Sequence, residues 1–244
     1  MPVGTATVPI GAPLCSAKLR VQNPVISDFE SYDGTVEAAA FTFYFGAAPN
    51  AGVLAGVFAF DDMTSANRRF GILAGRNGGW GASQQITQAT GWGGGMGIWF
   101  DCVDASAFSG ISFWARGSTA PGTFSLTASF LSSSAANAAD ARGGGTCTGG
   151  VEACANPTLE GIPLTLDWTL VEIPWTSLTS GLALGQPYVP NGDALMSLTF
   201  GLPIAWGADP SFVDNPNDMT DMPTFLPLPS DIIFQIDDIN FMPR

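Results

Sequence analysis

Hydrophobic and polar residues alternate along several short segments of this chain with a period of two. Residues 111–116 read Ile-Ser-Phe-Trp-Ala-Arg, so Ile, Phe and Ala share one face of a strand while Ser, Trp and Arg share the other. Residues 123–131 (Thr-Phe-Ser-Leu-Thr-Ala-Ser-Phe-Leu) and 195–200 (Leu-Met-Ser-Leu-Thr-Phe) divide in the same way into an apolar face and a hydroxyl face. This alternation predicts β-strands that are buried on one side.

Further segments of β-branched and aromatic residues lie between turn signals. The predicted strands are 25–30, 56–61, 71–74, 97–101, 111–116, 123–131, 169–174, 194–202 and 232–241. The 30 glycines and 18 prolines agree with many short strands joined by tight turns, and helix-period segments are almost absent. We therefore predict an all-β fold, a two-sheet antiparallel β-sandwich.

The domain organisation follows from the absence of repeats and of any composition break. We predict an irregular lead over residues 1–21, followed by a single sandwich domain over residues 22–244. The long segments 131–160 and 203–230 lack strand periodicity and are predicted as loops of this domain.

Two adjacent acids, Asp237 and Asp238, interrupt the last predicted strand. Strict alternation would point them to opposite faces of the sheet. A carboxylate that is buried needs a cation or several hydrogen bonds to remain ionised. Near the other end of the chain, Val25–Gly34 also leads into acids and a turn, so we predict that the first and last strands meet.

The charge and composition exclude several classes of function. With 21 acidic and 8 basic residues the net charge is −13, so the chain has no basic patch for phosphate and we predict no nucleic-acid partner. The absence of histidine excludes a Ser-His-Asp triad, a Cys-His pair and histidine metal ligands. No run of 18 apolar residues occurs, so no membrane span is predicted.

The four cysteines predict an oxidising compartment. Cys147 and Cys154 lie close together in a Gly-rich polar segment and are predicted to form a disulfide, which leaves Cys15 and Cys102 as the second pair. A zinc site made of cysteines alone is the alternative, although no C-x-x-C unit occurs. Met1–Ala17 lacks a charged n-region and contains three prolines, so it is not itself predicted to be a signal peptide. We expect a secreted or cell-surface location.

Five stretches carry a family resemblance. They are 28–30 (Asp-Phe-Glu), 91–100 (Gly-Trp-Gly-Gly-Gly-Met-Gly-Ile-Trp-Phe), 108–117 (Phe-Ser-Gly-Ile-Ser-Phe-Trp-Ala-Arg-Gly), 167–175 (Asp-Trp-Thr-Leu-Val-Glu-Ile-Pro-Trp) and 236–241 (Ile-Asp-Asp-Ile-Asn-Phe). In this order, over roughly residues 25–241, they resemble the galactose-binding-like jelly rolls of extracellular bacterial carbohydrate-binding modules. The resemblance is specific for the fold and weak for the ligand. It implies a non-catalytic module that binds a polysaccharide or oligosaccharide.

The same resemblance implies a structural calcium ion, because modules of this group commonly hold one where the first and last strands meet. Carried over to this sequence, Glu30 and Asp238 are the first candidate ligands, with Asp28, Asp33 and Asp237 next. Calcium prefers six to eight oxygen ligands, and clustered carboxylates repel one another without a cation. The alternative is a set of solvent-facing acids at the strand ends.

Sugar recognition needs an aromatic ring for the C–H face of the sugar and polar groups for its hydroxyls. We predict that one concave sheet presents Trp114 and Arg116 together with the hydroxyls of Thr127, Ser129 and Thr199 on neighbouring strands. The residues predicted to complete the site from loops are Trp80, Trp92, Arg76, Tyr188 and Trp206. The tryptophans assigned to core or structural contacts are Trp99, Trp168 and Trp175.

Two other functions remain open at this point. A carboxylate-based polysaccharide-degrading enzyme would need two acids facing each other across a cleft. The available acids, none of which lies in a recognisable signature, are Asp61, Asp62, Glu152, Glu160 and Glu172. An adhesion or structural surface module would share the fold, the calcium and the disulfides but would bind no glycan.

Overall fold

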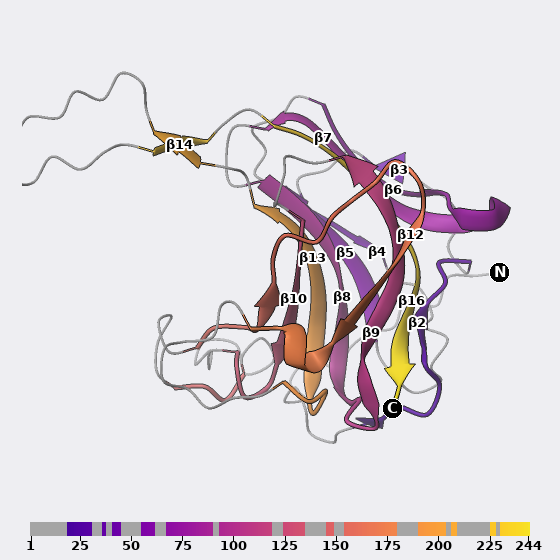
Figure 1. The fold of residues 1–244 in the computed structure, drawn as a ribbon, viewed down its shortest axis with the longest axis vertical. Coiled ribbons are helices and arrows are strands. Elements are labelled where there is room, and N and C mark those ends of the chain that lie inside the picture. Colours follow the sequence, from indigo (N-terminus) through magenta and orange to yellow (C-terminus); the bar gives the residue numbers. More distant parts are fainter. Residues whose placement is uncertain are drawn as a thin grey trace, which may run out of the picture.

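The computed structural model describes residues 19–30, 36–37, 41–44, 55–61, 67–89, 93–118, 124–134, 145–148, 154–179, 190–203, 206–208, 225–227 and 230–244. Within these residues, two seven-stranded sheets pack face to face (Figure 1). This arrangement confirms the predicted all-β, two-sheet sandwich. The described residues contain no helix long and apolar enough to cross a membrane.

Sheet A has the strand order β11-β10-β13-β8-β5-β4, and β1 also pairs with β8. Its strands are β1 (Leu19–Arg20), β4 (Phe41–Tyr44), β5 (Ala55–Asp61), β8 (Gly93–Asp104), β10 (Ser125–Phe130), β11 (Thr158–Leu159) and β13 (Leu195–Pro203). All pairings in this sheet are antiparallel except that of β1 with β8. The described end of the predicted N-terminal lead thus joins sheet A as β1.

Sheet B has the order β12-β9-β16-β7-β6-β3, with β2 on β16, and its pairings are antiparallel. Its strands are β2 (Val25–Ser27), β3 (Val36–Glu37), β6 (Asn67–Ala74), β7 (Trp80–Ala89), β9 (Phe108–Ser118), β12 (Thr169–Pro174) and β16 (Ser230–Pro243). Ser27 of β2 pairs with Ile239 of β16, which confirms that the first and last predicted strands meet. Two single turns of 3₁₀ helix, η1 (Arg76–Gly78) and η2 (Trp175–Ser177), follow β6 and β12.

Three strands lie in segments that we predicted to be loops. β11 lies within segment 131–160, and β14 (Trp206–Ala208) pairs with β15 (Phe225–Pro227) within segment 203–230. Figure 1 shows this two-stranded ribbon apart from the sandwich. β7 was also missed, because Ser83, Gln84 and Gln85 interrupt its apolar pattern.

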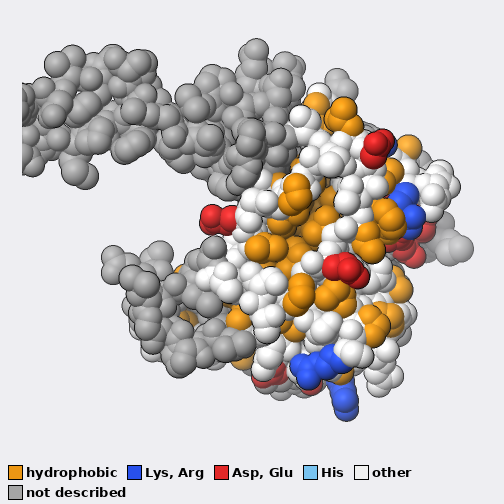
Figure 2. Space-filling model, viewed as in Figure 1, with side chains coloured by type: hydrophobic (Ala, Val, Ile, Leu, Met, Phe, Trp, Pro, Cys, Tyr) orange, Lys and Arg blue, Asp and Glu red, His pale blue; other side chains and the backbone are white. Residues whose placement is uncertain are grey.

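The core lies between the sheets and is rich in aromatic rings. Phe113 of β9 and Phe200 of β13 meet edge to face with their centroids 4.9 Å apart, and Phe124 lies 5.3 Å from Phe234 of β16. All four side chains are fully buried. Figure 2 shows further hydrophobic side chains gathered along the side of the sandwich where β10 and β12 lie. Burial of each of these phenylalanine side chains between the sheets contributes about 1.5–3 kcal/mol, which holds the two sheets together.

A β-bulge in β16 changes which way its acids point. Asp237 pairs with Trp114 of β9, and the next paired residues are Asn240 and Ser112, so two residues of β16 oppose one residue of β9. Asp238, in the bulge, has φ of 48°. The alternation is therefore shifted by one residue, and both carboxylates reach the same residue, Arg76, on the outer side of sheet B. The prediction that the two acids face opposite sides is wrong for this reason.

Candidate functional site

The side chains predicted to form one binding face lie on two different sheets. Trp114 and Arg116 belong to β9 of sheet B, whereas Thr127 and Ser129 belong to β10, and Thr199 to β13, of sheet A. The outer faces of a two-sheet sandwich point in opposite directions. The prediction that these five residues share a face is therefore wrong, although the three hydroxyl residues do lie together.

The outer face of sheet A carries a tryptophan among hydroxyl groups. Across the strands, Ser129 pairs with Ser197, Ser197 with Trp99, and Trp99 with Gly56, so these residues form one row. Trp99 is partly exposed. Its neighbours Ile98 and Phe100 point into the core. Trp99 is one of the tryptophans predicted to make core or structural contacts, and its side chain lies on the outer face of sheet A.

A second row of hydroxyl groups runs beside the first. Thr158 pairs with Thr127, Thr127 with Thr199, and Thr199 with Gly97. The hydroxyls of Thr127 and Thr158 are 2.9 Å apart and share a hydrogen bond. Hydroxyls in these rows repeat at the strand spacing of about 4.8 Å. We call the set Trp99, Thr127, Ser129, Thr158, Ser197 and Thr199 the hydroxyl face.

The chemistry of the hydroxyl face is uncharged. Its serine and threonine side chains each donate one hydrogen bond and accept others, and the Trp99 ring offers an apolar surface. Gly56 pairs with Trp99, and Gly97 lies two residues before it on β8. The face combines an aromatic ring with hydrogen-bonding groups and contains no acid–base pair.

The outer face of sheet B has a different character, because its tryptophan is covered by the protein itself. The Arg76 guanidinium lies 4.2 Å from the centroid of the Trp114 ring. The same guanidinium binds Asp238, with Nη2 2.5 Å from Oδ2, and the Arg76 main-chain N–H donates to Oδ2 of Asp237 at 2.7 Å. These four residues form what we call the Arg76 cluster. The Arg76 guanidinium thus covers one face of the Trp114 ring, and the ring helps to hold the guanidinium in place.

Asp237 is the buried acid of this cluster, with 3% of its surface exposed. Burial is the largest influence and raises the pKa of the Asp237 carboxyl. Hydrogen bonds from the main-chain N–H groups of Arg76 and Asp238 lower that pKa, while the negative charges of Asp238 and Glu30 raise it. The net direction is upward, so the ionised carboxylate is destabilised in the fold.

The predicted calcium ligands lie near this cluster. The Glu30 carboxylate lies against the turn of η1, since a methyl group on Gly79 would meet its Oε1. The Asp28 carboxylate accepts a hydrogen bond from the Glu30 N–H at 3.1 Å. Glu30, Asp237 and Asp238 thus lie close together beside η1, and Asp33 lies outside the described residues. Among the described residues, no group of three or more acids or cysteines is arranged to hold a metal ion.

The charges and hydrogen bonds of the acids beside η1 fit a bound cation only in part. Arg76 already supplies a positive charge to Asp238, and both oxygens of Asp237 accept main-chain hydrogen bonds. The charges of Glu30 and Asp238 still disfavour ionised Asp237, and a cation beside them would relieve that repulsion. Glu30 is exposed and Asp28 is partly exposed.

Several other predicted site residues lie wholly or partly outside the described part of the chain. Trp80 is the first residue of β7 and Trp206 the first of β14, and their side chains lie outside the described part, as do Trp92 and Tyr188 entirely. Trp175 is buried, and its Nε1 donates to the Phe108 carbonyl at 3.1 Å, which confirms its structural role.

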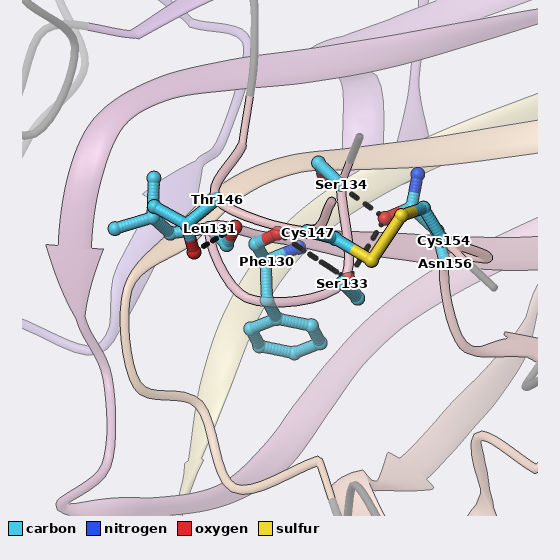
Figure 3. Close-up of a disulfide and its surroundings, with 8 residues drawn as sticks. All are labelled: Phe130, Leu131, Ser133, Ser134, Thr146, Cys147, Cys154 and Asn156. Carbon is cyan, nitrogen blue, oxygen red and sulfur yellow. Dashed lines mark hydrogen bonds between the residues drawn. A yellow bond between two sulfur atoms is a disulfide. The ribbon is translucent and has the colours of Figure 1, made fainter. Parts of the chain in front are cut away.

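The cysteines form disulfides. The predicted bond between Cys147 and Cys154 is present (Figure 3). Cys102 is also disulfide-bonded, and Cys15, its predicted partner, lies outside the described residues. The alternative prediction of a zinc site made of cysteines is therefore wrong for these three residues.

Hydrogen bonds tie the disulfide-bonded segment to the end of β10. The hydroxyls of Ser133 and Ser134 donate to Oδ1 of Asn156 at 2.8 and 3.0 Å, and the Thr146 N–H donates to the Leu131 carbonyl at 2.7 Å (Figure 3). The segment that carries the Cys147–Cys154 bond is thus anchored beside sheet A.

Comparison with known proteins gives structural similarities only. No family model and no curated protein matches this sequence. The structure is similar to the family 11 carbohydrate-binding module of the cellulosomal cellulase Lic26A-Cel5E of Clostridium thermocellum, with 16% identity over 92% of this chain and 96% of that one and a TM-score of 0.44. The Clostridium thermocellum module in complex with a β-1,3-1,4-mixed-linked tetrasaccharide gives 16% identity over 91% and 95% and a TM-score of 0.45.

An enzyme is among the similar structures as well. An exo-β-agarase matches with 11% identity and a TM-score of 0.40 over 91% of this chain and 25% of its own. At these levels of similarity the function has to be argued from the residues of this chain.

Proposed function

We propose that this protein is a non-catalytic carbohydrate-binding domain that binds its glycan on the hydroxyl face of sheet A. The observation that carries the proposal is the row in which Trp99 stands beside Ser197 and Ser129, with Thr199 and Thr127 in the adjacent row. Stacking on the Trp99 ring would hold the C–H face of a sugar, and the hydroxyls would exchange hydrogen bonds with its OH groups.

A binding role fits these groups better than catalysis does. A glycosidase needs two carboxyl groups that flank the scissile bond. Glu160 follows β11 of sheet A and Glu172 lies in β12 of sheet B, and both are exposed. Asp61 ends β5, with its side chain outside the described part, and Asp62 and Glu152 lie outside the described residues. The hydroxyl face itself supplies no carboxylate.

We further propose that the domain belongs to a secreted or cell-surface protein. Its disulfides support this location, because such bonds persist in oxidising compartments. A structural calcium ion near Glu30 and Asp28 forms part of the same proposal. It is supported by the concentration of acids where β2 meets β16 and by the negative charges of Asp238 and Glu30, which add to the larger effect of burial in raising the pKa of Asp237.

The experiment that tests the function is affinity electrophoresis of the whole chain through gels containing one polysaccharide each. Neutral β-glucans, xylan, mannan and galactan form the main panel, with polygalacturonate as the acidic member, and each gel is run with calcium and with chelator. The proposal predicts retardation by at least one neutral polymer. If no polymer retards the protein, a surface module without a glycan ligand replaces this proposal, and new reducing ends appearing over time would replace it with an enzyme.

A further inference from the structure

Arg116, on the outer face of sheet B, is held in place by two contacts. Its Nε donates a 2.6 Å hydrogen bond to Oε1 of Gln235, the residue paired with it on β16. Its guanidinium carbon lies 4.7 Å from the centroid of the Trp168 ring. A stacked and hydrogen-bonded guanidinium loses little further rotational freedom when it binds a ligand.

The outer nitrogens of the Arg116 guanidinium have no partner among the described residues. The Nε bond to Gln235 is its only hydrogen bond there, and no described acid pairs with it. This contrasts with Arg76, which binds Asp238. In a chain with 21 acids and 8 basic residues, an arginine that is fixed by neutral neighbours presents an uncompensated positive charge.

Exposed aliphatic side chains surround this charge. Leu166, Leu170 and Ile233 are the large hydrophobic residues that are exposed in the described part of the chain, by 80, 44 and 41%. Leu170 pairs with Trp114, two residues from Arg116 on β9, and Ile233 pairs with Ser118, two residues away on the other side. The carbonyl of Thr165, next to Leu166, accepts a hydrogen bond from the Gly117 N–H at 2.7 Å.

We propose that this Arg116 face (Arg116, Trp168, Gln235, Leu166, Leu170 and Ile233) docks a polypeptide segment that presents a carboxylate flanked by apolar side chains. The free guanidinium nitrogens match a carboxylate in charge and in planar, two-pronged geometry. Aromatic and arginine side chains are enriched at protein–protein interfaces, and arginine and tryptophan are frequent hot spots. The aliphatic rim supplies apolar area that would leave water on binding.

The same features favour a polypeptide over a sugar acid. Arg116 lies over the Trp168 ring, so that ring face is not open to a sugar ring. The other exposed apolar groups are aliphatic and lack the flat surface on which sugars stack. The Arg116 face also lies on the opposite side of the sandwich from the hydroxyl face, so a protein partner and a glycan would not compete. This inference does not depend on the proposed glycan function.

The test is selection of random peptides displayed on phage against the whole chain, with counter-selection on the Arg116→Gln Leu170→Ser variant. Peptides with an acid flanked by Leu, Ile or Phe are expected to be enriched on the wild type. Synthetic forms of one such peptide, with its acid and with the acid changed to the amide, are then titrated against wild type, Arg116→Gln and the matched exposed-arginine control Arg20→Gln.

We expect the affinity to fall at least about tenfold when the peptide acid is changed to the amide, and equally when the protein carries Arg116→Gln. Combining the two changes should cause little further loss, and Arg20→Gln should leave the affinity unchanged. Equal melting temperatures and equal circular dichroism spectra show that the variants are folded. The proposal is overturned if no acidic, apolar-flanked peptides are enriched on the wild type. It is also overturned if Arg116→Gln leaves the peptide affinity unchanged. Arg116-dependent binding of polygalacturonate without peptide binding also overturns it and assigns the face to an acidic glycan.

Discussion

The main-chain N–H of Arg76 donates a 2.7 Å hydrogen bond to the carboxylate of Asp237, a residue 161 positions further along the chain. Asp237 faces the side where η1 lies, and the bulge in β16 turns the next residue, Asp238, to the same side. The Arg76 side chain adds an ion pair with Asp238 and a contact with Trp114. The turn between β6 and β7 is thereby fastened to the last strand.

The first prediction concerns the side chain of Arg76. Arg76→Ala keeps the main-chain hydrogen bond to Asp237 but removes the ion pair and the stacking on Trp114. Because these groups are partly exposed, we expect a loss of about 1–2 kcal/mol in the free energy of unfolding. Urea unfolding measures it, with Arg20→Ala as the exposed control. A loss below about 0.5 kcal/mol would show that the cluster does not stabilise the fold.

The second prediction is a pH dependence that originates at Asp237. Its pKa is raised above the unfolded value of 3.8, so the folded state holds the proton more tightly than the unfolded chain does. The stabilisation from this group is therefore fully present below pH 3.8 and is lost as the pH rises through the folded pKa. Relative to Asp237→Asn, the wild type should lose stability with rising pH across that window.

Urea unfolding of both proteins in chelator, from pH 3.5 to pH 7, measures this difference, with Asp167→Asn as the exposed-acid control. A difference that stays constant with pH, or that grows in favour of the wild type as the pH rises, contradicts the raised pKa.

The third prediction concerns the close approach of β9 and β12. A methyl group on Gly110 would lie 2.1 Å from the Ile173 carbonyl oxygen and 2.7 Å from Cα of Pro174, both main-chain atoms that cannot move without separating the strands. We expect Gly110→Ala to cost about 3 kcal/mol or more. Gly161→Ala is the matched control, because φ there is 72° but nothing lies within 4 Å, so it should cost about 1 kcal/mol. Similar melting temperatures for the two variants would contradict this packing.

The fourth prediction tests calcium as a stabilising ligand. If calcium binds near Glu30 at 100 times its dissociation constant, chelation removes about 2.7 kcal/mol of stability. We expect the melting temperature to fall by about 5 °C in chelator and Glu30→Gln to remove this sensitivity. Glu172→Gln, at an exposed position on β12, should retain it. If chelator leaves the melting temperature of the wild type unchanged, calcium does not stabilise this fold.

Local alternation was enough to predict the sandwich and most of its strands, because a strand buried on one face has to alternate. Thr169–Pro174 was predicted with the bounds that the structure gives. The same alternation failed at Asp238, since a bulge needs only one residue with positive φ and leaves no mark in the polarity pattern.

The candidate site was harder to predict, because alternation separates the two faces of a strand without assigning the strand to a sheet. Trp114 and Thr127 both face outward, but long-range pairing puts β9 beside β16 and β10 beside β13. Trp99 lies in an apolar stretch, Met-Gly-Ile-Trp-Phe, that gives no sign of an exposed face. Its position became clear only from its pairing with Ser197.

The central claim is that glycan binding takes place on the hydroxyl face, and a pair of tryptophan variants tests it most directly. Affinity electrophoresis in the neutral polysaccharide that retards the wild type is repeated with Trp99→Ala and with Trp114→Ala, after equal folding has been checked by circular dichroism. We predict that Trp99→Ala abolishes the retardation and that Trp114→Ala leaves it unchanged. Retardation that survives Trp99→Ala and disappears with Trp114→Ala would contradict the account and place the binding face on sheet B.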